Sequence, residues 1–294
     1  MPVEVLERIS TFTALGLRFW DATLDRQVRD GLKVTARPFF ERRVQERKAQ
    51  LTASGIYTFQ NLPGLRDLES GFVTADTSPA ISRRFVVEVS DDERRYVEIA
   101  FEVELPLPYR GVFLIGGGTV SPAEGVPPGM LLYSAPTRRR PTWFGAVRGE
   151  LAEAATGDPA AHALVAVTDP QGETWHGVAD SGGRFTVWLA YPGVEETPLG
   201  SPQVTPSQPL LERAWPVRVQ VFYSPATRQS LPGATLPDYE SVLTQNSADV
   251  WQLPPDGGGT PVPEWLGDLR FGRELTARSG DAPQLLVGPE TTSP

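Results

Sequence analysis

Paired carboxylates are the first candidates for chemistry in this chain. Glu102 and Glu104 lie two residues apart in an alternating segment, so both side chains would point from one face of a strand. Two such groups could serve as the acid and base of a hydrolase. The same spacing is also typical of a solvated sheet face, and the chain has neither a Gly-x-Ser-x-Gly nucleophile elbow nor histidines beyond His162 and His176. The sequence therefore favours a protein that is not an enzyme and has no catalytic residues.

Metal and cofactor chemistry has little support in the residue types. The acidic run Asp91–Glu93 lacks the spaced oxygen ligands and the bidentate glutamate of a calcium loop, and is typical of a hairpin tip. The glycines at 116–118 are not followed by the Lys-Ser/Thr of a phosphate loop. The absence of cysteine excludes thiolate metal sites, iron–sulfur clusters and disulfides. We expect no cofactor and no metal.

Tryptophan is the residue type that most favours a binding function, because exposed indole rings can stack on sugars. In the strand at 183–192, Trp188 lies on the face opposite Phe185, Val187 and Leu189. Trp188 is then either exposed for a ligand or covered by the proline-rich C-terminal region. A carbohydrate-binding β-sandwich is accordingly the alternative function. The seven tryptophans are Trp20, Trp143, Trp175, Trp188, Trp215, Trp251 and Trp265.

Composition bounds the remaining possibilities. The 294 residues include 28 glycines and 29 prolines, an excess that favours short strands and turns over a helical bundle. The net charge of −9 disfavours nucleic-acid binding, which requires a basic face. No run of 18 apolar residues is present, so we expect no membrane span, and a cytoplasmic location is the default.

Alternation of apolar and polar residues predicts the strands. Residues 94–105 place Val97, Phe101 and Leu105 on one face and acidic side chains on the other, and with the strand before them they form a hairpin at 84–105. Residues 39–51 fit either a charged edge strand or a short helix. Further strands are predicted at 16–22, 32–38, 55–64, 144–151, 162–169, 174–180, 183–192, 215–225, 269–275 and 284–288.

Two long segments rich in proline, 106–142 and 192–268, interrupt this pattern. They are too long to be idle connections in a compact domain. We expect contacts with other protein subunits to order them, in a repeated assembly in which the chain is a homo-oligomer. The candidate partner-contact residues are Tyr109, Tyr133, Arg138, Arg139, Arg140, Trp188, Trp251 and Trp265.

The segment Val147–Pro192 resembles the carboxypeptidase-regulatory-like, or Cna B-type, β-sandwich. Its V-x-G strand leads to a strand of the A-x-V-x-V type and then to Asp180-Ser181-Gly182-Gly183-Arg184-Phe185, which is similar to that family's D-x-x-G-R-F strand. Residues 18–38 followed by 53–64 repeat the order of strand, polar loop, strand and aromatic strand. The resemblance implies two related modules. Some members close a lysine–asparagine isopeptide bond, but residues 144–294 lack lysine, and in the first module Lys33 points away from the core phase that a bond to Asn61 would need.

The sequence as a whole predicts an all-β protein of two antiparallel β-sandwich modules, transthyretin- or immunoglobulin-like, joined by Pro/Gly-rich linkers. The predicted boundaries are 1–105 for the first module, 106–142 for a linker or docking loop, 143–225 for the second module and 226–294 for a C-terminal extension. Residues 17–35 and 55–69 also resemble accessory proteins of phage-tail-like contractile injection systems. That resemblance implies a structural or adaptor component, such as part of a baseplate, collar or fibre attachment.

Overall fold

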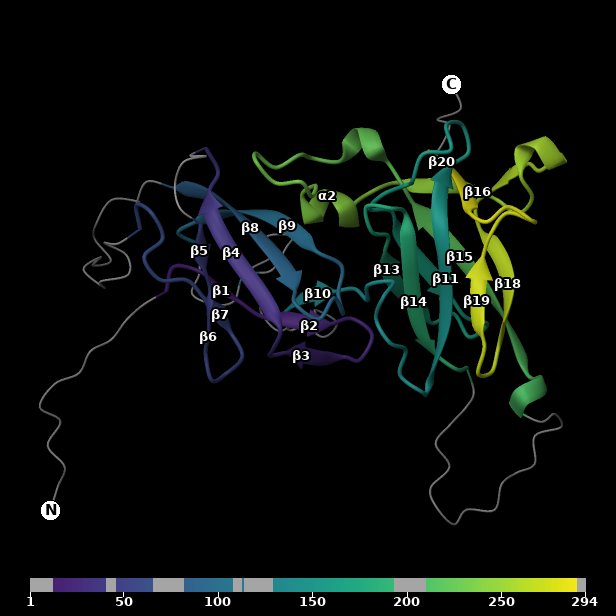
Figure 1. The fold of residues 1–294 in the computed structure, drawn as a ribbon, viewed down its shortest axis with the longest axis horizontal. Coiled ribbons are helices and arrows are strands. Elements are labelled where there is room, and N and C mark those ends of the chain that lie inside the picture. Colours follow the sequence, from purple (N-terminus) through teal and green to yellow (C-terminus); the bar gives the residue numbers. More distant parts are fainter. Residues whose placement is uncertain are drawn as a thin grey trace, which may run out of the picture.

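The computed structural model describes residues 13–40, 46–65, 82–107, 113, 129–192 and 210–289. Strands make up 48% of the structure and helices 6%, which confirms the all-β prediction. Figure 1 shows two sets of strands side by side along the long axis. Within the described residues, no helix is long and apolar enough to cross a bilayer.

The first set of strands is a sandwich built from short sheets, which we call the first sandwich. Its larger sheet has the order β5 (Arg47–Lys48), β4 (Leu32–Pro38), β8 (Arg83–Asp91), β9 (Ile99–Leu105). Two three-stranded sheets pack against it, with the orders β10 (Met130–Leu132), β2 (Phe19–Asp21), β3 (Arg26–Val28) and β1 (Gly16–Leu17), β7 (Tyr57–Thr58), β6 (Gln50–Leu51). The ambiguous residues 39–51 therefore contribute edge strands β5 and β6.

The predicted hairpin forms the centre of the first sandwich. β8 pairs antiparallel with β9 from Arg83↔Leu105 to Val89↔Ile99. Alternation places the apolar side chains of β9 in one buried cluster with those of β4 and β8. The predicted core face is confirmed, and it comprises Val97, Ile99, Phe101, Val103 and Leu105.

The second sandwich closes around a separate core. Its strands are β11 (Phe144–Glu153), β12 (Leu164–Thr168), β13 (Thr174–Val178), β14 (Arg184–Ala190), β15 (Ala214–Phe222), β16 (Ser247–Trp251), β17 (Pro261–Val262), β18 (Trp265–Arg270), β19 (Glu274–Ala277) and β20 (Leu285–Pro289). One layer is β14-β11-β19 and the other runs β13-β12-β15 and on to β16, β18 and β20. β11 joins the layers, because its first half pairs with β14 and its last residues pair with β20. Phe185, Val187 and Leu189 of β14 face Val165 and Val219 in the core between them.

The Asp-x-x-Gly-Arg-Phe motif has a clear local role in the second sandwich. The Asp180 carboxylate accepts hydrogen bonds from the backbone N–H groups of Gly182 and Arg184, at 2.9 and 3.0 Å. Gly183 has a φ of +77°, and a Cβ there would lie 2.4 Å from the Leu151 carbonyl oxygen. Only glycine fits that approach, so the turn fixes the register of β14 on β11.

The module boundaries differ from the predicted ones in two places. β10 lies inside the predicted linker 106–142, yet it pairs in parallel with β2 of the first sandwich. The predicted C-terminal extension supplies β16 to β20 of the second sandwich, together with α2 (Tyr239–Leu243) and η3 (Pro255–Gly257). The other short helices are η1 (Leu210–Glu212) and η2 (Pro225–Thr227).

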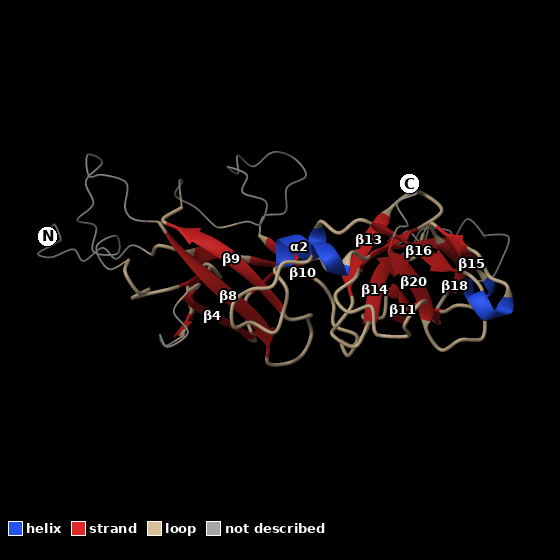
Figure 2. Ribbon diagram, turned by 90° about the horizontal axis from the view of Figure 1, so that it is seen from above, coloured by secondary structure: helices blue, strands red, loops and turns tan. Residues whose placement is uncertain are grey.

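Residues 229–243, which we call the crossing segment, connect the two sandwiches. Leu231 covers Val86 and Ala100 on the outer face of the first sandwich. Tyr239 and Val242 of α2 join the first core, and Figure 2 shows α2 between the two sets of strands. This corrects the expectation that other subunits order 192–268 for the crossing segment, because its own apolar side chains pack it onto its own chain.

Asp238 fixes the crossing segment to the open edge of β9. One carboxylate oxygen accepts from the Glu102 N–H at 3.2 Å, and the other accepts from the Ser241 N–H at 3.2 Å, as the N-cap of α2. A free strand edge exposes N–H groups that can pair with another chain. Asp238 therefore covers part of this edge while it begins the helix.

Candidate functional site

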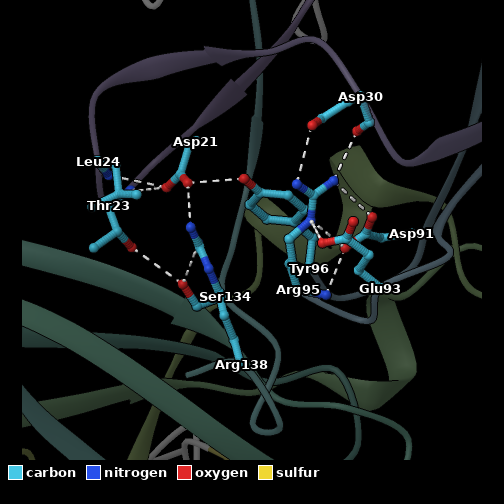
Figure 3. A network of polar contacts seen from close by, with 10 residues as sticks. All are labelled: Asp21, Thr23, Leu24, Asp30, Asp91, Glu93, Arg95, Tyr96, Ser134 and Arg138. Carbon is cyan, nitrogen blue, oxygen red and sulfur yellow. Dashed lines mark hydrogen bonds and ion pairs between the residues drawn. The ribbon is translucent and has the colours of Figure 1, made fainter. Parts of the chain in front are cut away.

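The junction of the sandwiches is organised around a buried ion pair. The Arg138 guanidinium donates to the Asp21 carboxylate at 2.5 Å, and the exposed fractions of the two side chains are 8% and 0%. Asp21 ends β2, where its carboxylate also accepts from the N–H groups of Thr23 and Leu24, both at 3.0 Å, and from the Tyr96 hydroxyl at 2.9 Å (Figure 3). The buried Asp21 carboxylate thus accepts four hydrogen bonds, and the donors come from three separate segments of the chain.

Arg138 links the first sandwich to the second through its flat faces. The guanidinium carbon lies 4.7 Å from the ring centroids of both Tyr96 and Trp188. A second nitrogen donates to the Ser134 hydroxyl at 3.0 Å. Cation–π contacts gain strength when they are removed from water, as here. Trp188 belongs to β14, so this stack joins the two sandwiches.

The surroundings of Asp21 stabilise its charged form. Burial would raise the pKa of the carboxyl, but the hydrogen bonds from Arg138 and the Leu24 N–H and the Arg138 charge outweigh it, so the pKa lies below its usual value. Burial and the neighbouring Asp21 charge raise the pKa of the Tyr96 phenol. Asp21 therefore stays ionised and Tyr96 stays neutral around neutral pH.

A second arginine fastens the hairpin tip nearby. Arg95 makes two bonds of 3.0 Å to the Asp91 carboxylate and one of 3.1 Å to Asp30, and Glu93 lies 3.6 Å away (Figure 3). These hydrogen bonds raise the pKa of the guanidinium. The Asp91 side chain is buried. The acidic tip thus binds an arginine of its own hairpin, and no cluster of metal-ligating side chains occurs in the described ranges.

A cleft of about 250 Å³ lies beside this network, between the sandwiches. Arg94, Glu98, His162 and Arg184 contribute charged or titratable groups to its lining. Burial and the Arg228 charge lower the pKa of His162, so its imidazole is neutral at pH 7. Small-molecule sites usually enclose about 300–1,000 Å³. This cleft is below that range.

A cavity of about 400 Å³ lies at the outer edge of the first sandwich, against Phe39 and Phe40. Two of the charged side chains in its lining, Arg84 and Glu104, already have partners. Arg84 stacks on the Phe39 ring at 4.1 Å and pairs with Glu102 at 3.0 Å, while Glu104 accepts from the Ser82 hydroxyl. Glu102 and Glu104 are therefore occupied as surface partners, as a solvated sheet face predicts.

The structure buries four of the eight candidate partner-contact residues: Tyr133, Arg138, Trp188 and Trp265. This corrects their assignment as surface contacts. Arg138 is occupied by Asp21, and Trp188, which is 1% exposed, lies against the Arg138 guanidinium. The Trp265 indole donates to the Arg278 carbonyl at 2.9 Å within the second core.

The other four candidate partner-contact residues are not buried or lie outside the described residues. Arg139 is exposed, and Arg140 and Trp251 are half-buried. Tyr109 lies outside the described residues. Lys33 is exposed on β4 and Asn61 is exposed in the turn after β7. The isopeptide bond between them, against which the sequence argues, remains untested.

Sequence reasoning named Arg138 and Trp188 as candidates but missed the contacts that hold the junction together. Asp21 and Arg138 are 117 positions apart, and no local pattern marks either as a partner of the other. Asp238 precedes a short helix in Pro-Asp-Tyr-Glu, where an N-cap signal was available, but its contact with β9 had no sequence signal. Trp143 is 79% exposed and lies three residues after the arginine run.

Comparison with known proteins finds only distant likenesses. No protein-family model matches the chain, and no curated protein matches it. Among solved structures, it is similar to the shaft pilin SpaA from Lactobacillus rhamnosus GG (10% identity, 97% of this chain and 100% of that chain, TM-score 0.24). It is also similar to the minor pilin GBS52 from Streptococcus agalactiae (9% identity, 90% and 93% coverage, TM-score 0.23). TM-scores this low do not establish a shared fold or a shared role.

Proposed function

We propose that this chain is a non-enzymatic structural component of a larger protein assembly, in which it acts as a rigid body of two sandwiches. The observation that supports the proposal is the filled junction. Arg138 is held by Asp21 and stacked on Trp188, and the crossing segment places Tyr239 and Val242 in the first core. Two-domain enzymes and binding proteins usually keep a cleft open where their domains meet. Here the junction is packed, and the cleft that remains beside it measures only about 250 Å³.

The more specific proposal is a part of a contractile injection system, such as a baseplate, collar or fibre-attachment protein. It rests on the resemblance of residues 17–35 and 55–69 alone. A rigid spacer suits such a particle, because force passes through a body whose modules cannot rotate against each other. The carbohydrate-binding alternative loses its main residue, since Trp188 is buried.

The test has two readouts. Small-angle X-ray scattering of the purified chain should fit a single rigid shape. The Arg138→Ala variant should require a wider range of shapes, whereas the matched Arg139→Ala variant should still fit the single shape. Affinity purification from the native host, followed by sedimentation and mass spectrometry, should recover the chain in a large particle. A flexible wild-type chain, or one that sediments only as a free monomer, would contradict the proposal.

A further inference from the structure

Figure 1 shows the turn between β18 and β19 at one end of the second sandwich, and basic and aromatic residues lie in this turn and in two segments beside it. Three segments meet there. The Arg140 guanidinium donates to the Gly272 carbonyl at 3.5 Å, and the Phe271 N–H donates to the Arg213 carbonyl at 3.4 Å. We call this surface the arginine–tryptophan end, and it comprises Arg139, Arg140, Trp143, Arg213, Arg270 and Arg273.

Trp143 supplies the apolar part of this surface. Its neighbour Phe144 pairs with Ala190, and the ring of the next residue, Tyr191, lies 4.7 Å from that of Phe271. The backbone next to Trp143 is therefore paired within the sheet, while the Trp143 side chain is 79% exposed. Leu211, two residues before Arg213, is 77% exposed. Large apolar side chains this exposed on a soluble surface commonly mark a contact site.

The charge of this end is unbalanced. None of its five arginines forms an ion pair among the described residues, whereas Arg148, Arg184 and Arg218 of the same sandwich pair with Glu274, Asp180 and Glu264. Three exposed acids lie close in the chain, Glu212, Asp268 and Glu274, and Glu274 is already paired with Arg148. A positive excess thus persists here in a chain whose net charge is −9.

We propose that the arginine–tryptophan end docks an acidic segment of a partner protein that also carries an apolar side chain. The inference deepens the proposed structural function and rests on it. Arginine forks bind carboxylates in a planar, bidentate manner, and arginine and tryptophan are the residues most often found at the energetic centre of protein interfaces. Trp143 and Leu211 would receive the apolar side chain, and the arginines would surround it.

The geometry favours a protein partner over nucleic acid or a membrane. Nucleic acid requires an extended basic face, and beyond this end the acidic chain would repel a phosphate backbone. An anionic bilayer attracts clustered lysine and arginine as well, but the charge here is confined to one turn and the segments beside it. A short acidic segment matches that size.

A direct test uses the full chain and defined probes. Fluorescence anisotropy should detect binding of a labelled peptide of alternating glutamate and leucine, but not of its lysine–leucine counterpart, and added salt should weaken binding. Arg270→Glu with Arg273→Glu should reduce the affinity at least about tenfold, equivalent to about 1.4 kcal/mol. The matched control is Arg26→Glu with Arg29→Glu, two exposed arginines of the first sandwich, and it should change the affinity by no more than about twofold.

Each remaining outcome decides the matter. Equal binding of both peptides, or an unchanged affinity of the Arg270/Arg273 variant with its fold intact by circular dichroism, would overturn the proposal. Displacement of the acidic peptide by duplex DNA or phosphatidylserine vesicles at lower concentration would assign the end to a polyanion instead. Peptide binding at this end by a chain that is absent from any particle would refute the proposed function alone, and a particle component that ignores the peptide would refute the docking site alone.

Discussion

Arginine and tryptophan meet at two places in this molecule, with opposite results. At the junction, Arg138 lies between Tyr96 and Trp188, and Asp21 neutralises it. At the arginine–tryptophan end, the very next residues, Arg139 and Arg140, accompany Trp143 without an acid of their own. The same residue types thus form a sealed contact in one region and an open surface in the other.

The difference lies in one carboxylate. Burying a guanidinium is costly unless a paired acid and further hydrogen bonds compensate, and Asp21 provides the acid where β2 ends. No acid of the described residues pairs with the arginines of the second region, and these arginines are exposed or half-buried. An arginine–aromatic cluster is therefore closed or available depending on whether its own chain supplies the counter-ion.

The largest contrast is expected between the two tryptophans. Trp188→Ala should lower the free energy of unfolding by about 3–5 kcal/mol, because it leaves a cavity between the sandwiches. Trp143→Ala should change it by less than about 0.5 kcal/mol, because that side chain is exposed. Urea unfolding followed by circular dichroism measures both, and similar losses would show that Trp143 is part of the packing.

Core phenylalanines test whether the junction couples the sandwiches. Phe101 and Phe185 occupy separate buried clusters, and either change to alanine should cost about 3–5 kcal/mol. Phe222 is only partly buried, so Phe222→Ala should lower the free energy of unfolding by less. If the junction makes the protein one cooperative unit, each variant unfolds in a single shifted transition, and two separated transitions would contradict that coupling.

The arginines themselves give the sharpest form of the comparison. Arg138→Ala should destabilise the chain by about 3–5 kcal/mol, since Asp21 would be left buried without its counter-ion. Arg139→Ala should cost less than about 0.5 kcal/mol. A double variant, Asp21→Asn with Arg138→Met, should cost less than the sum of the two single changes. Additive losses in chemical denaturation would mean that the pair is not coupled.

Acid should weaken the junction through Asp21. Because its native pKa lies below the usual value of 3.8, the carboxylate contributes stability that is fully present above that value. This contribution is lost as the pH falls from 3.8 through the lowered native pKa. The urea midpoint, measured from neutral to acidic pH, should fall less in Asp21→Asn than in wild type over that window, and an equal fall would exclude this contribution.

Local patterns in the sequence predict much of the fold. The alternation at 97–105 identifies the core face of β9, and the Asp-x-x-Gly-Arg-Phe motif identifies the turn before β14. Both depend on neighbouring residues, through the period of a strand and the positive φ of Gly183. The late strand predicted at 284–288 is confirmed as β20, whereas the strand predicted at 269–275 is wrong, because residues 271–273 form the turn between β18 and β19.

The junction could not be predicted in this way, because its partners are far apart in the chain. Arg138, Arg139 and Arg140 are identical in type and consecutive, yet only Arg138 finds an acid, 117 residues upstream. Leu231 and Tyr239 lie in a proline-rich stretch that indicates loop, although they pack on the first sandwich. The exposure of Trp143 likewise depends on which segments pack together in the fold, and the residues beside it in the sequence do not indicate it.

The crossing segment has a consequence for the synthesis of the chain. Asp238, which covers the edge of β9, follows the end of that strand at Leu105 by 133 residues. A ribosome adds about 5–20 residues per second, so β9 is synthesised roughly 7–27 s before the residue that covers its edge. During that interval Val86 and Ala100 have no cover, and the strand edge is open to pairing with other nascent chains. Slow translation after residue 105 would therefore lengthen the period of greatest aggregation risk, and holding by a chaperone would be most useful then.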